Sequence, residues 1–197
     1  IIQLFEEYMY GRIPGTRPEV TFEPAETDTG ALGGKAIRKN ITVCFCKEGD
    51  TVKMDLLLWI PVHAVKPVPL FLGMNFYGNQ SVHPDKGIAV TRSFVLDNPG
   101  YHIVNNTATG ASRGADTAAW PVERILERGY GLATFCCGDM DPDFDDGFRN
   151  GIHALLDCRD KSDSNALSTI SAWAYGLTTA MDYLVTDALI HKDQVVV

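Results

Sequence analysis

The strongest constraint on the fold is an alternation of short apolar runs with amphipathic helical patterns. The runs KPVPLFLGMNF, at 66–76, and YGLATFCC, at 130–137, are almost wholly apolar, as is typical of strands that are buried on both faces. A helical pattern lies between them at 121–128, and Gly129 ends it. Strands that alternate with helices form parallel sheets with right-handed crossovers. The sequence therefore predicts an α/β fold.

A second helical segment, at 164–184, continues this alternation, and Ser164 is its predicted N-cap. The segment is followed by Val195–Val197, a β-branched run that favours a strand. We expect this run to be a central strand, flanked on both sides, with its C-terminal end directed at a cleft. Apolar residues recur along the helical segment at steps of three and four: Leu167, Ile170, Ala174, Leu177, Met181 and Leu184.

The segment before these elements predicts an antiparallel hairpin at one edge of the sheet. AIRKNITVCFC, at 36–46, and TVKMDLLLWIP, at 51–61, flank a turn at Gly49 and Asp50. The complete order is that of the N-terminal half of an α/β-hydrolase domain, a mostly parallel three-layer α/β/α sandwich. Rossmann and flavodoxin-like folds share the alternation but place a phosphate-binding loop early. No GxGxxG or GxxxxGK[ST] pattern follows a predicted strand here.

Composition excludes several classes of partner. The 197 residues suit a single domain. The formal net charge of −8 and the lack of a basic run argue against nucleic acid, whose phosphates require clustered Lys and Arg. The apolar stretches are interrupted before they reach the roughly 18 residues of a membrane helix, so no membrane span is expected.

The cysteines and the acidic loop do not predict a metal site. The five cysteines contain no CxxC pair, so we interpret them as buried thiols, and a disulfide through Cys158 stays open if the protein is exported. The string DMDPDFDD fails the EF-hand pattern, because counting from Asp139 places Phe144 at the sixth position and Asn150 at the twelfth. We expect a solvated acidic loop and no cofactor.

Five strings in combination carry a resemblance to a known family. They are EEYMYGRIPG, GGKAIRKNITVCF, PLFLGMNFYGNQ, WPVERILERGYGLATFCCGDMDPDF and ISAWAYGLTTAMDYL. Together they resemble the glucuronoyl esterases, carbohydrate esterase family fifteen, and in particular their bacterial branch. The resemblance extends from Leu4 to Val197, and its specificity lies in the combination of strings.

The resemblance implies where the catalytic residues lie. In the family, the strand that matches DQVVV continues into a G-[CH]-S-R-x-G-K elbow, which carries the nucleophilic serine and an oxyanion-stabilising arginine. The nucleophile, acid and histidine are therefore all expected after Val197, and none within 1–197. An α/β-hydrolase presents Ser, acid and His in that chain order. Structural or surface roles are accordingly expected for the five histidines: His63, His83, His102, His153 and His191.

One part of a catalytic site is expected within the chain. In α/β-hydrolases the loop after the third strand donates a backbone N–H to the oxyanion hole. An ordinary strand-to-loop turn is the alternative, and the long segment at 77–119 is expected to rim the cleft. The candidates for an oxyanion or cleft-lining role are Asn75, Phe76, Tyr77, Gly78 and Asn79.

The implied activity of the whole protein is serine-mediated hydrolysis of plant cell-wall carbohydrate esters, of the 4-O-methyl-glucuronoyl type that links lignin to glucuronoxylan. The alternatives are an acetyl-xylan-type deacetylase on the same fold and a non-catalytic carbohydrate-binding relative. We expect residues 1–197 alone to be inactive, because the remaining half of the domain is needed to complete the sheet. A secreted or periplasmic location is expected for the parent protein.

Overall fold

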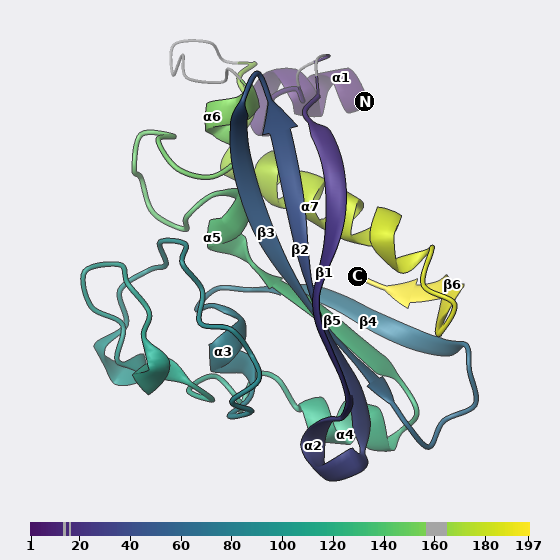
Figure 1. Ribbon diagram of the computed structural model, residues 1–197. Helices are drawn as coiled ribbons and strands as arrows, with labels where there is room; N and C mark the ends of the chain where they lie inside the picture. The colour runs from purple at the N-terminus through teal and green to yellow at the C-terminus, as the bar shows by residue number, and fades with distance from the viewer. Residues whose placement is uncertain (14, 16, 157–164) are drawn as a thin grey trace.

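A computed structural model describes residues 1–13, 15, 17–156 and 165–197. These residues form one six-stranded mixed sheet in the order β1-β2-β3-β5-β4-β6, with helices on both faces (Figure 1). Along the chain, helices separate β4 from β5 and β5 from β6, and this is the alternation predicted from the sequence. The fold is of the α/β-hydrolase type.

The antiparallel half of the sheet contains β1 (Glu19–Gly30), β2 (Ala36–Lys47) and β3 (Asp50–Pro61). The β2–β3 hairpin is confirmed, and its register is unbroken from one end to the other. β1 pairs with β2 but was not predicted from the sequence. Its polar string PAETDT lacks apolar alternation, and most of the strand is exposed, so no periodicity marks it.

The parallel half contains β4 (Val68–Asn75), β5 (Gly131–Cys136) and β6 (Ile190–Val196). β4 is parallel to both β5 and β6, whereas β3 joins β5 in antiparallel orientation. Antiparallel pairings thus outnumber parallel ones in the described sheet, so the sheet of this chain is mixed rather than mostly parallel. The difference arises from the hairpin and the unpredicted strand β1.

Val195 and Val196 lie in β6, as predicted, although the strand begins earlier, at Ile190, and ends before Val197. Within the described residues β6 pairs with β4 alone, so the expectation of a strand flanked on both sides is wrong for this chain. Val196 is accordingly 57% exposed. The strand type and its parallel direction were predictable from the sequence.

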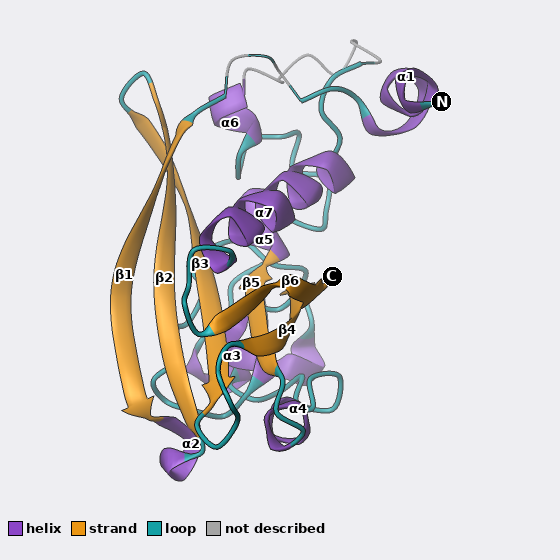
Figure 2. Cartoon of the chain, turned by 90° about the vertical axis from the view of Figure 1, so that its right-hand side faces the viewer, coloured by secondary structure: helices purple, strands orange, loops and turns teal. Residues whose placement is uncertain are grey.

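Two apolar clusters cover the two faces of the sheet. Leu56 and Leu58 of β3 belong to one cluster, with α7, whereas Leu57 and Trp59 belong to the other, with α4. Because adjacent strand residues point to opposite faces, the continuous run LLLW reflects burial on both sides. Figure 2 shows α7 running alongside the strands. The α-helices are α1 (Ile2–Phe5), α2 (Ala31–Gly34), α3 (Asn79–Val82), α4 (Val122–Glu127), α5 (Cys137–Met140), α6 (His153–Leu156) and α7 (Thr169–Leu184).

Details at the start of α7 differ from the sequence-based expectation. Ser168 is the N-cap, and its Oγ accepts a hydrogen bond of 3.3 Å from the backbone N of Ser171. The predicted cap Ser164 lies outside the described residues, as does Cys158. The described cysteines are all free thiols: Cys44, Cys46, Cys136 and Cys137.

Candidate active-site edge

The candidate site lies where the parallel strands end. Asn75, the last residue of β4, is level with Cys136, the last residue of β5, and β6 runs parallel on the other side of β4. Loops at the carboxyl ends of parallel strands are where α/β folds carry their sites. The candidate segment is therefore Asn75–Asn79, here called the β4 loop.

Two asparagines fix the β4 loop to the sheet. The Nδ2 group of buried Asn75 donates hydrogen bonds to Asn79 Oδ1, at 2.7 Å, and to Thr134 Oγ1, at 3.0 Å. Asn79 Nδ2 in turn donates to the backbone O of Asp55 at 2.6 Å. The loop is thereby attached to β5 and β3 by buried, directional contacts. Both asparagines hold the loop through their side chains.

Gly78 occupies a position that other residues would not tolerate. Its φ of +88° lies in the left-handed region, which L side chains rarely adopt. A Cβ atom there would also lie 2.5 Å from Gln80 Oε1 and 2.5 Å from Thr91 Cγ2. The close approach of Gln80 to the loop backbone thus requires glycine.

Gln80 is a buried residue that sequence reasoning missed. Its Nε2 donates to the backbone O of Tyr77 at 2.8 Å and to Ser112 Oγ at 3.0 Å, and its Oε1 accepts from Thr91 N at 3.0 Å. A trans peptide directs its C=O and N–H to opposite sides, so the Tyr77 contact turns the Gly78 N–H away from Gln80. Within the described residues that N–H has no acceptor. The oxyanion role of the loop stays a prediction, and its geometry provides such a donor.

Aromatic contacts connect the β4 loop to α7 on one side and to Tyr101, further along the long segment, on the other. Phe76 packs edge-on against Trp173 of α7, with ring centroids 5.6 Å apart. Tyr77 packs edge-on against Tyr101 at 4.9 Å. The Tyr101 hydroxyl donates to Asp116 Oδ1 at 3.0 Å, and this acceptor raises the pKa of Tyr101. The long segment therefore lies against the candidate site, while its predicted part in rimming a cleft remains to be tested.

Comparison with known proteins connects this geometry to a family. No family model matches the chain. A curated protein named carbohydrate esterase MZ0003, from an unknown prokaryotic organism, is 44% identical over 99% of this chain and 45% of its own length. A promiscuous CE15 esterase from a marine bacterial metagenome has a solved structure with a TM-score of 0.84 and 43% identity, covering 98% of this chain and 48% of that one.

A glucuronoyl esterase from Solibacter usitatus superimposes with a TM-score of 0.85 at 35% identity, covering 98% of this chain and 49% of the other. The sequence identities and the structural superpositions point to the same family. The chain is similar in sequence and in fold to carbohydrate esterase family 15. It spans about half the length of the relatives it matches. A family 15 glucuronoyl esterase from Caldicellulosiruptor kristjansonii, at 17% identity and a TM-score of 0.57, supports the fold alone.

The described part of this chain holds no assembled serine–histidine pair. Among the described residues, no serine hydroxyl is hydrogen-bonded to a histidine ring. His83 Nδ1 accepts from the backbone N of Asp85 at 3.1 Å. His153 is fully buried, 3.4 Å from the carboxylate of Asp141. Both contacts are structural in kind, and the placement of the catalytic serine, acid and histidine after Val197 stays a prediction.

One buried carboxyl group lies beside the β4 loop, in the short helix α5 that follows β5. Burial raises the pKa of Asp139 to about 7. The group accepts hydrogen bonds from Ser93 Oγ at 2.6 Å and from the backbone N of Asp55 at 3.0 Å. Asp139 thus connects α5 to β3 and to the segment near Ser93.

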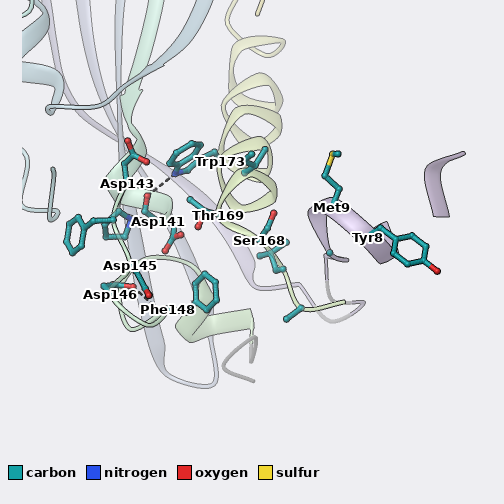
Figure 3. A pocket seen from close by; sticks show the side chains of 16 residues that line it. Tyr8, Met9, Asp141, Asp143, Asp145, Asp146, Phe148, Ser168, Thr169 and Trp173 are labelled. Carbon is teal, nitrogen blue, oxygen red and sulfur yellow. Dashed lines mark hydrogen bonds between the residues drawn. The ribbon is translucent and has the colours of Figure 1, made fainter. Parts of the chain in front are cut away.

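The acidic loop lines a pocket of about 770 Å³ between α7 and the N-terminal residues (Figure 3). Trp173 Nε1 donates to the backbone O of Asp141 at 2.8 Å. The carboxylate of Asp146 accepts from the backbone N of Phe148 at 2.8 Å and of Asn150 at 3.1 Å, so it caps its own turn. Across the described residues, no group of three His, Cys, Asp or Glu is arranged to hold a metal ion.

Proposed function

We propose that the protein containing this chain is a carboxylic ester hydrolase that acts on carbohydrate esters, and that its ester is of the glucuronoyl type. The observation that carries the proposal is the 44% identity to a carbohydrate esterase over 99% of the chain. The close structural match to a glucuronoyl esterase at 35% identity supports it. Because the chain spans about half of these relatives, the activity concerns the whole protein.

The geometry suits acyl transfer through an oxyanion. A serine nucleophile, predicted to follow Val197, would attack the uronate carbonyl. The ester C–O bond would break, the alcohol would leave with a proton, and water would then hydrolyse the acyl-enzyme to the free uronic acid and the serine. The negative charge that develops on the carbonyl oxygen requires donors already in position. The β4 loop supplies a candidate donor, the Gly78 N–H, on a backbone that Gln80 and Asn75 fix. No cofactor is needed for this chemistry.

The acetyl-xylan alternative has weaker support. A Bacteroides fragilis protein proposed to be an acetyl xylan esterase matches at 13% identity with a TM-score of 0.51, which speaks for the fold alone. The carbohydrate-binding alternative has no specific observation in its favour. We include in the proposal the lignin–glucuronoxylan ester as natural substrate, with a role in lignocellulose degradation. Export of the protein is included as well, because a cell-wall polymer lies outside the cell. No described helix is long and apolar enough to cross a membrane.

The test is a substrate comparison with the full-length protein. We expect hydrolysis of benzyl 4-O-methyl-glucuronate and much slower release of acetate from acetylated xylan, at equal enzyme concentration. A fluorophosphonate probe, which labels activated serines, should modify the protein once per chain. Faster acetate release would favour the deacetylase, and neither turnover nor labelling would favour the non-catalytic binder.

A further inference from the structure

A second pocket, of about 720 Å³, lies between β2, β3 and the segment at 86–93. This volume is within the range of small-molecule sites and accommodates one or two sugar rings. Asn79, the last residue of the β4 loop, is part of its wall, and so is Asp139. The pocket therefore adjoins the candidate site on the side of β4 that faces β5 and β3.

The carboxylates that line this pocket already have partners. Glu26 accepts from Arg38 Nη2 at 3.2 Å and from Asn40 Nδ2 at 3.1 Å. Asp55 Oδ1 accepts from Thr42 Oγ1 at 3.0 Å. Asp139 is bound by Ser93 and by the backbone of Asp55, as described above. Each acid of the pocket is thus engaged with the protein itself.

The basic residues of the pocket, unlike its acids, have no hydrogen-bond or ion-pair partner within the described residues. Lys53, Lys86 and Arg92 all line it and are exposed. Within the described residues none of the three is hydrogen-bonded or ion-paired. The chain has a formal net charge of −8, so acidic residues exceed basic ones. Three unpaired cations on a single pocket, whose own acids are occupied, favour an anionic ligand.

We propose that this pocket is a subsite for a free uronate carboxylate on an acidic oligosaccharide substrate, adjacent to the residue whose ester is cleaved. The inference rests on the proposed function and deepens it. Arg92 and the two lysines bind the carboxylate, and polar side chains such as Asn40 and Thr42 receive the sugar hydroxyls. The protein thereby prefers esters on polymers that carry further uncapped uronic acids.

The test measures binding and turnover separately in the full-length protein. The probes are an oligosaccharide with two free glucuronic acids and a neutral xylo-oligosaccharide of equal length, in titration calorimetry. We expect the acidic probe to bind at least about tenfold more tightly, since each charge-assisted hydrogen bond is worth about one order of magnitude. Added salt should reduce this preference, because the three cations are exposed.

Variants test whether the pocket causes the preference for the acidic probe. The triple variant K53Q/K86Q/R92Q should lose the preference for the acidic probe, and R92Q alone should lose part of it. R128Q is the matched control, because Arg128 is exposed at the end of α4 and does not line the pocket. Thermal melts verify that each variant is folded. Equal binding of both probes by the wild type, or an undiminished preference in the triple variant, would overturn the inference.

Hydrolysis of the small benzyl glucuronate separates this inference from the proposed function. Wild type and the triple variant should cleave it at equal rates, since a small ester does not reach the pocket. If the wild type cleaves no ester, the proposed function is wrong, whereas the binding comparison still decides whether the pocket selects carboxylates.

Discussion

The antiparallel half of the sheet and the C-terminal edge of the parallel half are stabilised in different ways. β2 and β3 pair along twelve residues each, and many side chains of the hairpin, such as Leu58, are buried in an apolar cluster. At the end of β4 the buried groups are polar instead. Asn75 donates hydrogen bonds to the side chains of Asn79 and Thr134, and Gln80 donates to the backbone O of Tyr77.

This difference separates stability from site geometry. Apolar burial is non-directional and roughly proportional to area, so substitutions in the hairpin should lower the free energy of unfolding without moving the β4 loop. A buried polar network is directional, and each unpaired group in it is costly. Substitutions there should affect turnover by more than their effect on stability explains.

The largest expected effect on stability tests the apolar half. Leu58→Ala removes a fully buried side chain and should cost about 2–5 kcal/mol of unfolding free energy, with little change in turnover of the folded enzyme. Denaturant unfolding and ester kinetics of the full-length protein measure both quantities. A loss below about 1 kcal/mol, or a turnover defect larger than the loss of folded protein, would contradict the comparison.

The next effect concerns Asp139 and depends on pH. Its pKa is about 7 in the folded protein and about 3.9 in an unfolded chain. The folded state therefore retains a proton that the unfolded state releases, and stability falls as pH rises from about 4 to about 7. This group alone should lower the unfolding free energy by roughly 4 kcal/mol over that range.

Asp139→Asn should make that part of the profile flatter, because the amide does not titrate. Its oxygen can still accept from Asp55 N, and its NH₂ can donate to Ser93 Oγ. The measurement is the unfolding free energy of both proteins between pH 4 and pH 8. Parallel profiles would show that burial of Asp139 contributes nothing to the pH dependence.

A smaller change in stability, with a larger effect on turnover, is expected at Asn75. Asn75→Ala removes two hydrogen bonds and leaves Asn79 Oδ1 and Thr134 Oγ1 unpaired, which costs about 1–3 kcal/mol. Displacement of the loop should reduce turnover more than tenfold, on the order of a lost oxyanion contact. Thr134→Val is the matched variant, because it removes one bond and leaves the Asn75–Asn79 contact. Equal turnover in the wild type, Asn75→Ala and Thr134→Val would show that the hydrogen-bond network has no part in catalysis.

The two regions also differ in how far the sequence predicts them. The hairpin follows from apolar alternation, because pleat and burial impose a period of two. The turn predicted at Gly49 and Asp50 lies one residue earlier, at Glu48 and Gly49. The position of the β4 loop follows from the end of an apolar run. The contacts of Gln80 do not follow, because its partners Thr91 and Ser112 lie in a segment without periodicity. Local pattern therefore locates the loop but does not show what holds it.

The central claim is that the β4 loop forms part of an ester-hydrolysing site, and a pair of glycine variants tests it most directly. Gly78 and Gly49 have φ values of +88° and +93°, so alanine introduces similar backbone strain at both, about 1–2 kcal/mol. At Gly49 the new Cβ meets no atom within 4 Å, whereas at Gly78 it meets the Gln80 amide.

The measurement is kcat/KM of the full-length protein for benzyl glucuronate. We predict that Gly78→Ala reduces kcat/KM about a hundredfold, as expected for a misplaced catalytic backbone. Gly49→Ala should leave kcat/KM unchanged, and the thermal stabilities of the two variants should be similar. Equal kcat/KM in wild type and Gly78→Ala would contradict the claim.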